Sequence, residues 1–387
     1  MHLKRKAMLL IAAAMISFCG AGNAAAAKTE RPRPATAQTE KPRPEKQKKT
    51  ETPEKREKPR HVAVQTERSR ARGFALKKGD CIGVLAPASW ESRSQWESGV
   101  RLLKNRGYRV KLAPSCTESC GFFSGTDERR AADHNAFFRD DEVRAILCLR
   151  GGYGSGRILD MLDYAEIARH PKLFIGYSDI TALHIALGEK SGIATVHGPM
   201  LTSLASGSLT DYTERSFFRG VMTSRPLGEL TMPPGQALEA VVPGTAEGVI
   251  VGGNLSVLQA LIGTPYELKG DGALLFLEDI DLLSYQLDRT LQQLFQCGLL
   301  DRVNGLLFGS FTGGDSALDP GDYTTAEVID YYSNLIGKPA IMGVPAGHGS
   351  DNAFIPFGVH AVMKANADGT ASLVFDEAAA LPREDKK

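Results

Sequence analysis

Residues 143–183 read VRAILCLRGGYGSGRILDMLDYAEIARHPKLFIGYSDITAL, and this stretch decides the fold class. Its apolar runs at 143–150 and 172–178 are short and bounded by glycine or polar residues, which is typical of buried strands. A glycine-rich loop and a short helix separate the two runs, and another helix begins at Asp179. Strand, helix and strand in this order predict an α/β fold with a parallel sheet that is covered by helices.

The same alternation continues on both sides of this stretch. Further strands are predicted at residues 81–89, 108–114, 272–280, 303–313 and 339–349, with helices between them and a C-terminal hairpin that turns at 367–369. A chain of 387 residues suits about two domains, at roughly 100–200 residues for each. Four prolines fall within 224–244, where we place the linker between an N-terminal α/β domain, 74–223, and a C-terminal domain, 245–387.

The first 27 residues have the pattern of a secretory signal peptide. Lys4, Arg5 and Lys6 precede an apolar run that ends in small residues, with cleavage expected before residue 28. An uncleaved membrane anchor is the alternative, although the apolar run is short for a span. A lipoprotein anchored at Cys19 is a further alternative, but bulky Phe18 precedes that cysteine. We therefore expect export to the periplasm or cell envelope.

Residues 28–73 are rich in Lys, Arg, Glu and Pro and contain few large apolar side chains, which predicts a disordered linker. They hold 15 Lys and Arg against seven Asp and Glu, a net charge of +8. Since the N-terminal 27 residues add +3 and the whole chain carries +1, residues 74–387 carry −10. An acidic body argues against a nucleic-acid partner. The linker is either a spacer or a basic tail that contacts anionic envelope polymers or lipid.

The cysteines do not form a recognisable framework. Signal-peptide removal would leave five, an odd number, although Cys116 and Cys120 could pair in an oxidising compartment. No spacing of Cys and His residues indicates a zinc site, and we expect no metal.

Ligands of open parallel sheets gather at the carboxyl ends of the strands, and three such ends carry polar groups. The first is RGGYGSG, residues 150–156, whose glycines allow close backbone approach and anion binding. A dinucleotide fingerprint is the alternative, but the position of its final glycine is Arg157. We therefore expect no nucleotide cofactor.

The second strand end carries Ser178, in the turn between a strand and a helix. A serine in such a turn exposes its hydroxyl at the sheet edge, close to backbone N–H groups that can hold an oxyanion. The sequence G-Y-S-D is not the G-x-S-x-G elbow, because Ile180 replaces the final glycine. The alternative is a serine that only caps the helix.

A nucleophilic serine needs a base, and the base needs an orienting acid. Glu278 and Asp279 end a predicted buried strand, and His348 lies in the glycine-flanked loop PAGHGSDN. His197, in TVHGPM, is a competing candidate for the base, or a residue that only supports the serine turn. Three further histidines of the body are less well placed: His134, His170 and His184.

Several motifs together resemble the LD-carboxypeptidases (muramoyltetrapeptide carboxypeptidases) and their microcin-immunity relatives. They are IGVLAPAS, LRGGYGSGR, IGYSDIT, TVHGPM, GGNLSVLQALIGTP, LFLEDI, LDRTLQQL and GVPAGHGSDNAFIPFG, in order within residues 76–383. The resemblance implies a Ser178–His348–Glu278 triad, with oxyanion donors in the backbone N–H groups of Asp179 and Gly152. It also implies a flavodoxin-like N-terminal domain, a C-terminal domain built around β-strands with flanking helices, a homodimer and no metal.

The resemblance further implies the activity. We expect a serine carboxypeptidase that releases the terminal D-alanine of murein tetrapeptide by cutting an L,D-peptide bond. Arg150, Gly151, Tyr153 and Asn254 are the residues expected to bind this substrate. The alternatives are a microcin-immunity-like serine peptidase and a secreted wall-binding protein without activity.

Overall fold

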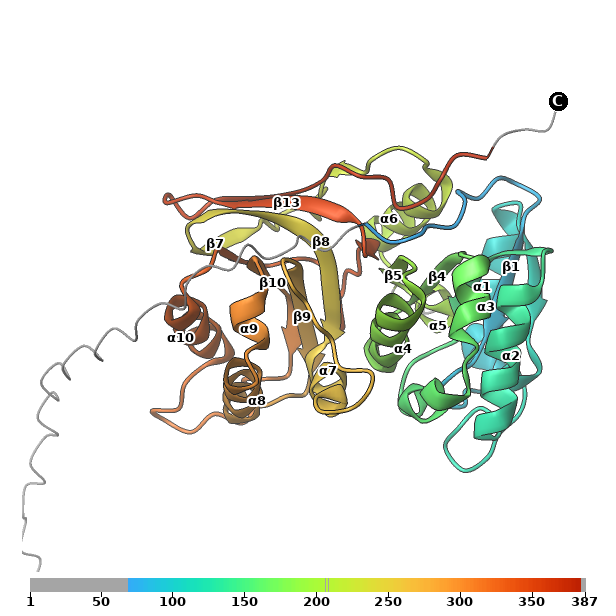
Figure 1. Cartoon of the computed structure of the whole chain (residues 1–387), viewed down its shortest axis with the longest axis horizontal. Helices are drawn as coiled ribbons and strands as arrows, with labels where there is room; N and C mark the ends of the chain where they lie inside the picture. The colour runs from blue at the N-terminus through green and yellow to red at the C-terminus, as the bar shows by residue number, and fades with distance from the viewer. Residues whose placement is uncertain (1–68, 206, 208, 384–387) are drawn as a thin grey trace, which may run out of the picture. The chain divides into compact units, whose positions relative to one another are not determined.

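The computed structural model describes residues 69–383, apart from Ser206 and Ser208. The predicted signal peptide and most of the predicted linker lie outside the described residues. Within the described part of the chain, no helix is long and apolar enough to span a membrane. The described chain contains two β-sheets with helices packed on them (Figure 1).

The first sheet has six strands in the order β12-β5-β4-β3-β1-β2. The bounds are β1 (Cys81–Leu85), β2 (Arg109–Leu112), β3 (Val143–Cys148), β4 (Leu173–Gly176), β5 (Thr195–His197) and β12 (Ile355–Phe357). Strands β1 to β5 are parallel, and β12 pairs antiparallel with β5. The order 2-1-3-4-5 is that of flavodoxin-like sheets, so the predicted fold of this part is confirmed.

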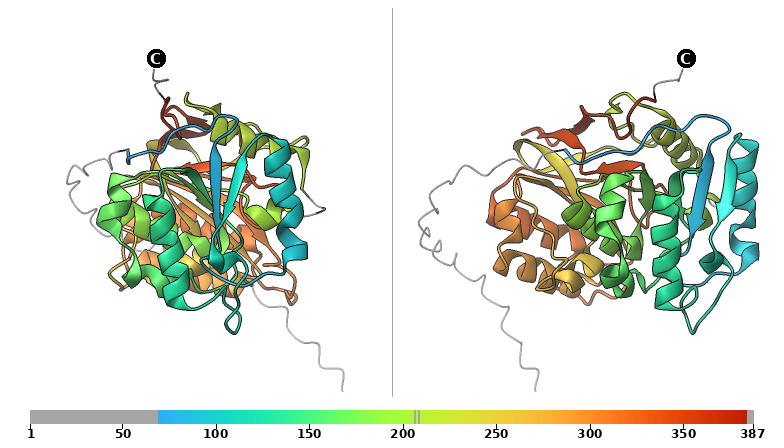
Figure 2. Two further views of the ribbon diagram at one scale, coloured as in Figure 1. Left: turned by 90° about the vertical axis from the view of Figure 1, so that its right-hand side faces the viewer. Right: turned by 45° about the vertical axis from the view of Figure 1, so that its right-hand side comes forward.

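Helices cover both faces of this sheet (Figure 2). The α-helices are α1 (Arg93–Asn105), α2 (Asp127–Arg139), α3 (Tyr164–Arg169), α4 (Thr181–Ala186), α5 (Leu201–Ala205) and α6 (Asp211–Met222). In α1, buried Trp96, Gly99 and Leu103 recur every three or four residues and form its packed face. Thr126 caps α2 by accepting the backbone N–H of Arg129.

The second sheet has eight strands in the order β6-β14-β13-β8-β9-β10-β11-β7. Their bounds are β6 (Gly228–Glu229), β7 (Glu239–Val242), β8 (Gly244–Asn254), β9 (Leu274–Ile280), β10 (Gly305–Thr312), β11 (Ala340–Met342), β13 (His360–Ala365) and β14 (Ala371–Phe375). Helices α7 (Leu255–Leu261), α8 (Ser284–Gln296), α9 (Leu299–Arg302) and α10 (Thr325–Ile336) connect the central strands. Strands β13 and β14 form the predicted C-terminal hairpin.

The boundary between the two predicted domains is not a simple break along the chain. Residues 224–244 are not a free linker, because β6 and β7 within them form the two edges of the second sheet. Strand β12, although it follows most of the second sheet in sequence, completes the first sheet. Because these segments cross between the two parts of the sequence, the described residues form one compact unit that contains both sheets.

The predicted disordered linker also ends earlier than expected. Residues 69–73 lie against the folded body. The backbone N–H of Ala71 donates to the carbonyl of Gly192 at 2.8 Å, and its carbonyl accepts the N–H of Ala194 at 2.7 Å. Arg72 forms an ion pair with Glu377 at 2.9 Å. Backbone hydrogen bonds do not depend on side-chain type, which explains why composition did not predict this pairing.

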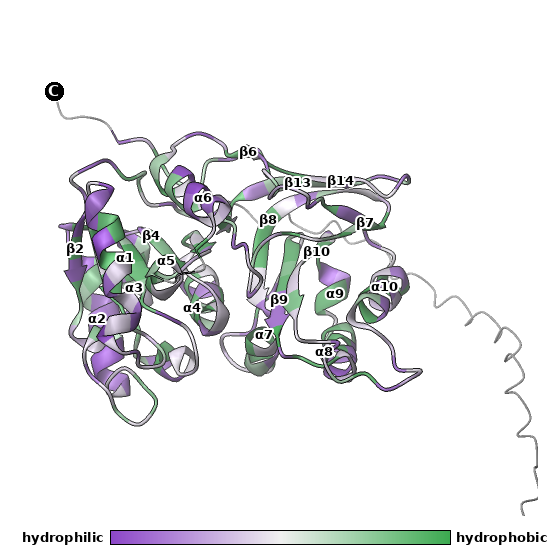
Figure 3. Cartoon of the chain, turned by 180° about the vertical axis from the view of Figure 1, so that it is seen from behind, coloured by the Kyte–Doolittle hydropathy of each residue, from purple (hydrophilic) through white to green (hydrophobic). Residues whose placement is uncertain are grey.

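The core lies between the sheets and their helices, where central strands such as β9 and β10 are largely apolar (Figure 3). Ile146, Phe174 and Leu277 are completely buried, as expected for strands covered on both faces. Cys116 and Cys120 do not pair: all five described cysteines are free, Cys116 is buried and Cys120 is exposed. Burial raises the pKa of the Cys116 thiol to about 12, so this thiol is unreactive.

Candidate active site

Ser178 lies in a strained turn directly after β4. Its φ angle is +64°, and within the described residues only Asp281 is another non-glycine residue with positive φ. Such a conformation costs of order 1–3 kcal/mol and is concentrated at functional sites. The turn is tight, because a Cβ atom on Gly176 would lie 2.9 Å from the side chain of Ile180. The sequence therefore makes a sharp corner that presents the serine hydroxyl at the sheet edge, and Ser178 is not a simple helix cap.

The three predicted residues meet at this corner although they come from both sheets. The hydroxyl of Ser178 lies 3.0 Å from Nε2 of His348, and Nδ1 of His348 lies 2.7 Å from Oε2 of Glu278. Glu278 belongs to β9, and His348 lies in the loop between β11 and β12. An ionised carboxylate only accepts hydrogen bonds, so Nδ1 carries the imidazole proton and Nε2 accepts the proton of the serine hydroxyl.

The electrostatics of Glu278 and His348 support this assignment. Burial acts to raise the pKa of the fully buried Glu278, but the nearby His197 and His348 outweigh it and lower the pKa to about 2. Burial acts to lower the pKa of His348, but the hydrogen bond to Glu278 and the charges of Asp279 and Asp281 raise it above its usual value. At neutral pH the carboxylate is therefore ionised and holds a basic imidazole.

The glycine loop after β3 borders the serine. A Cβ atom on Gly151 would lie 3.1 Å from the Ser178 hydroxyl and 3.4 Å from the backbone nitrogen of Asp179. Gly152 has a φ of +99° and lies against Ser89, where a Cβ would approach the serine oxygen to 2.3 Å. The loop thus needs its glycines in order to approach Ser178 closely. The two predicted oxyanion donors, at Asp179 and Gly152, lie in the turn and in this loop.

Buried polar groups hold both loops in place. The carboxylate of Asp179 accepts the backbone N–H of Ser155 at 2.8 Å, and burial raises its pKa. The guanidinium of Arg130 is completely buried and donates to the carbonyls of Pro87 and Gly154. Sequence analysis did not single out Arg130, because an arginine within an amphipathic helix resembles any solvated charge.

Three of the residues predicted to bind substrate lie in different environments. Arg150 forms an ion pair with Glu91 at 2.6 Å, at the edge of the site. Tyr153 is exposed and packs near Phe122 and Phe123. Gly151 borders the serine, as described above. These three residues remain candidates for contact with a substrate.

The side chain of Asn254 makes two hydrogen bonds within the fold. Its side-chain oxygen accepts the N–H of Val257 and so caps α7, and its amide donates to Asp279 at 3.1 Å. Asp279, the other acid considered, accepts hydrogen bonds from Ser256 and makes none with His348. Asn254 and Asp279 therefore form a hydrogen-bonded network next to Glu278, with which Asn254 pairs between β8 and β9, and contact of Asn254 with a substrate stays a prediction.

His197, the competing base, does not reach Ser178 by any hydrogen bond in the structure. Its ring is completely buried, with Nε2 3.7 Å from Oε1 of Glu278. It therefore approaches the carboxylate oxygen of Glu278 that His348 does not contact. Within residues 69–383, apart from the two gaps, no cluster of His, Cys, Asp and Glu is arranged to hold a metal ion.

A polar cavity of about 360 Å³ adjoins His348. It is lined by Glu91, Gln95, Tyr177, Thr202, Ser203, Leu209, Thr210, Thr213, Gly347, Gly349, Ser350 and Asn352. Tyr177 precedes Ser178 in the chain, and Gly347 and Gly349 flank His348, so this cavity lies beside the predicted site, although Ser178, His348 and Glu278 do not line it.

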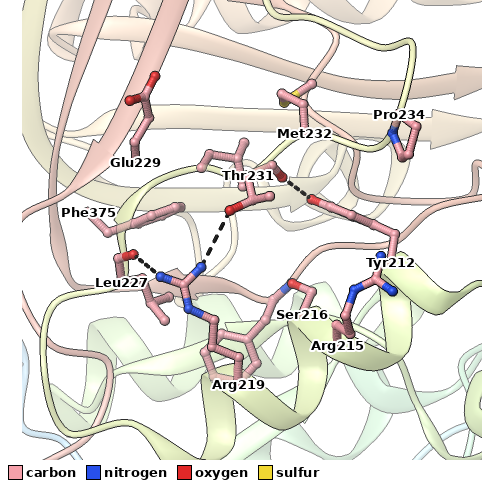
Figure 4. Close-up of a pocket in the computed structure, with 12 residues that line it drawn as sticks. Tyr212, Arg215, Ser216, Arg219, Leu227, Glu229, Thr231, Met232, Pro234 and Phe375 are labelled. Carbon is pink, nitrogen blue, oxygen red and sulfur yellow. Dashed lines mark hydrogen bonds between the residues drawn. The ribbon is translucent and has the colours of Figure 1, made fainter.

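A second cavity, of about 300 Å³, lies between α6 and residues 227–234 (Figure 4). Arg219 donates to the carbonyl of Leu227 and to Thr231, and the hydroxyl of Tyr212 donates to the carbonyl of Thr231. None of the residues proposed for chemistry lines this cavity. Its polar groups instead hold the segment that precedes and follows β6 against α6.

Comparisons with known proteins identify the family of this chain. Residues 82–198 match the model of the LD-carboxypeptidase N-terminal domain, and residues 247–363 match that of the C-terminal domain. The chain belongs to the LD-carboxypeptidase family. This is a family of serine-type peptidases, so the chain is a hydrolase.

Members of the family with similar sequences and structures cover most of the chain. A probable murein peptide carboxypeptidase of Bacillus subtilis (strain 168) is 39% identical over 298 residues, which are 77% of this chain and 92% of the relative. The crystal structure of muramoyltetrapeptide carboxypeptidase from Oxalobacter formigenes has a TM-score of 0.67 and 28% identity, covering 77% of this chain and 99% of that one. An MccF-like protein from Bacillus anthracis has a TM-score of 0.72 and 29% identity, covering 79% and 99%.

Proposed function

We propose that this chain releases the terminal D-alanine of murein tetrapeptide through a Ser178–His348–Glu278 triad and an acyl-enzyme. The observation that carries the proposal is the continuous relay of hydrogen bonds, 3.0 Å and 2.7 Å long, from the strained serine to the buried carboxylate. The murein peptides named for its relatives supply the substrate class.

In the first half of the reaction, His348 accepts the proton of Ser178 through Nε2 while Oγ attacks the carbonyl carbon of the L,D-peptide bond. The electrons of the carbonyl move to its oxygen, where the backbone N–H groups of Asp179 and Gly152 stabilise the charge. His348 then donates its proton to the peptide nitrogen, the C–N bond breaks, and D-alanine leaves. The product of this half is a serine ester of the shortened peptide.

Water completes the cycle. His348, neutral again, accepts a proton from a water molecule as the water oxygen attacks the ester carbonyl. The second tetrahedral intermediate collapses, the proton passes from His348 to Oγ of Ser178, and the tripeptide leaves with a free carboxylate. Glu278 keeps its negative charge throughout and stabilises the imidazolium of both transition states.

The polar cavity beside His348 is the proposed place of the substrate. His348 protonates the leaving amine, so the D-residue must lie close to the His348 loop, which supplies Gly347, Gly349 and Asn352 to this cavity. The side chain of Glu91 also lines it and is paired with Arg150. A murein peptide carries both carboxylates and amines, and this pair of opposite charges is suited to meet either group.

Mass spectrometry of purified protein incubated with murein tetrapeptide tests the proposal. We expect the loss of one alanine from the tetrapeptide, no change in its all-L analogue, and no reaction with Ser178→Ala. Labelling of the wild type by a serine-directed fluorophosphonate, absent in Ser178→Ala, would show a reactive nucleophile independently of substrate. An intact tetrapeptide in the presence of a labelled enzyme would refute the substrate and leave the nucleophile.

A second candidate acts on a different acyl partner. The likeness to an MccF-like protein favours a microcin-immunity-like peptidase, with the same three residues. Hydrolysis of a peptidyl-nucleotide analogue without tetrapeptide cleavage would select this candidate. A wall-binding protein without activity would neither react with fluorophosphonate nor cleave either substrate.

The cellular setting is proposed from the sequence and the family resemblance. The signal-peptide pattern supports export to the periplasm or envelope, and the basic linker supports peripheral contact with anionic envelope material. Fractionation of cells would test the first, and salt-sensitive sedimentation with envelope fractions the second. The homodimer is tested by light scattering of the purified protein.

A further inference from the structure

His197 is a buried histidine between the nucleophile strand and the acid. It ends β5, which pairs with β4 on one side and with β12 on the other. Its side chain and that of Glu278 are both completely inaccessible to solvent, and Nε2 lies 3.7 Å from Oε1 of Glu278. That distance is slightly longer than a hydrogen bond.

The polar atoms at this contact have no other partners. Both ring nitrogens of His197 and Oε1 of Glu278 are buried and lack hydrogen bonds to any described residue. An unpaired buried polar group costs about 1–3 kcal/mol, and more when it is charged. Buried polar groups in proteins are normally hydrogen-bonded, so two unpaired groups that face each other from different sheets call for an explanation.

The other buried histidines of the body show what structural roles look like here. A ring nitrogen of His184 is 2.9 Å from the carbonyl of Gly176. His134 has no hydrogen bond and lies between the rings of Phe138 and Phe174, with no carboxylate beside it. His197 alone among these three faces the carboxylate of Glu278.

We propose that His197 is a positioning residue of the active site, which acts through Glu278. In its neutral form with the proton on Nε2, it donates to Oε1 once the two atoms approach by less than ~1 Å. Glu278 is then held by two donors, His348 at Oε2 and His197 at Oε1. The inference rests on the proposed catalytic role of Ser178, His348 and Glu278.

The placement of His197 gives this contact a mechanical consequence. Glu278 belongs to the second sheet, whereas Ser178 and His197 follow or end neighbouring strands of the first. A bond from His197 to Glu278 therefore ties the acid to the sheet that carries the nucleophile. Rings of Tyr177, Phe276 and Phe357 surround His197 and fix its orientation.

The test replaces His197 by phenylalanine, which fills the same aromatic site without a donor, and by glutamine, which retains an N–H donor. The titratable groups that face this contact are Tyr177, His184, Glu278 and His348, and Asp279 and Asp281 act on His348 through their charge. None of these is altered by the two substitutions. His134→Phe is the matched control, because it removes an equally buried imidazole without hydrogen bonds, and no ion pair or hydrogen bond links that imidazole to Glu278.

We expect His197→Phe to lower kcat by about 10–100-fold with KM within threefold, since a misplacement of about 1 Å can cost 10² in rate. The charge of Glu278, without its second donor, should bind the His348 proton more strongly. The acidic limb of the kcat/KM profile then moves to higher pH. His197→Gln should recover most of the rate and the wild-type limb, and His134→Phe should keep both.

Two results would overturn the inference. The first is a His197→Phe enzyme with the wild-type kcat and an unchanged acidic limb of its kcat/KM profile. The second is an equal loss of kcat in His197→Phe and His197→Gln, with the acidic limb of both variants as in the wild type. If His197→Phe does not fold, the glutamine variant decides by the same criteria. The rate of Ser178 labelling by fluorophosphonate is measured in parallel at each pH, because it reports the triad without the peptide. If the labelling rate changes in His197→Phe as expected but the wild-type enzyme leaves tetrapeptide intact, the proposed substrate is refuted and the role of His197 is not.

Discussion

Glu278→Gln is the substitution that tests the role of the acid most directly. It keeps the shape of the side chain and removes its negative charge. Glu278 is completely buried and lies 2.7 Å from His348, so no solvent can replace the lost charge. One orientation of the glutamine amide would place its NH₂ group against Nδ1 of His348. That orientation reverses the tautomer and turns Nε2 into a donor that cannot accept the Ser178 proton.

We expect kcat to fall by about 10³–10⁴-fold, the upper value being the loss found when an aspartate triad loses its charge. At about 1.4 kcal/mol for each factor of ten, this is ~4–5.5 kcal/mol of transition-state stabilisation. KM should change by less than about threefold, because Glu278 lies behind His348 and does not line the polar cavity. Steady-state kinetics on murein tetrapeptide measure both constants.

Asp279→Asn is the matched control, since it removes a neighbouring buried charge that makes no hydrogen bond with His348. Its kcat should fall by less than about tenfold, because the hydrogen bonds it disturbs, from Ser256 and Asn254, are not made to Ser178, His348 or Glu278. A larger fall in Asp279→Asn than in Glu278→Gln would exchange the two roles. A Glu278→Gln enzyme impaired only in KM would assign Glu278 to substrate binding.

The Glu278→Gln substitution should also change how the free energy of unfolding depends on pH. The pKa of Glu278 is lowered on folding, to about 2, so ionisation stabilises the folded state above the usual glutamate pKa. This contribution is lost as pH falls from about 4.5 towards 2. Urea unfolding of wild type and Glu278→Gln should therefore show a difference that shrinks over this range. A difference that is constant with pH would contradict the ionised state of Glu278.

Three further predictions follow from the described contacts. Ser178→Ala should remain folded with activity lowered by roughly 10³–10⁶-fold. The free energy of unfolding in urea should be higher for Ser178→Gly than for Ser178→Ala by about 1 kcal/mol, because glycine accepts positive φ. Equal free energies would contradict strain in the turn. A chain that begins at Phe74 should melt below one that begins at Ser69, since it loses four backbone hydrogen bonds, made by Arg70, Ala71 and Gly73, worth about 1 kcal/mol each. Identical melting would show that this segment adds nothing. Arg130→Met should destabilise by about 3–5 kcal/mol in urea, because it leaves the partners of a buried charge unpaired; a loss below 1 kcal/mol would refute that role.

Much of the first sheet and its chemistry is local and could be predicted from the sequence. Apolar runs predicted the central strands within a few residues, and their alternation with helices predicted parallel pairing. The polar residues at strand ends then pointed to Ser178, Glu278 and His348, because ligands gather at the carboxyl ends of parallel strands. Only the structure shows that Ser178 and Glu278 follow or end strands of different sheets. The turn at Ser178 was also predictable, since glycine and serine follow a buried strand there.

Other features depend on segments that are distant in sequence. His197 was a plausible base by its position near Ser178, and only the meeting of the two sheets places it beside Glu278. Residues 224–244 and 69–73 resemble linkers in composition, but they pair through backbone groups, which every sequence provides. Local patterns determine which segments become strands and where polar groups emerge, whereas the partners of each group depend on long-range packing. The sequence by itself therefore determined the strands and the candidate residues, and the tertiary structure decided which of those residues touch.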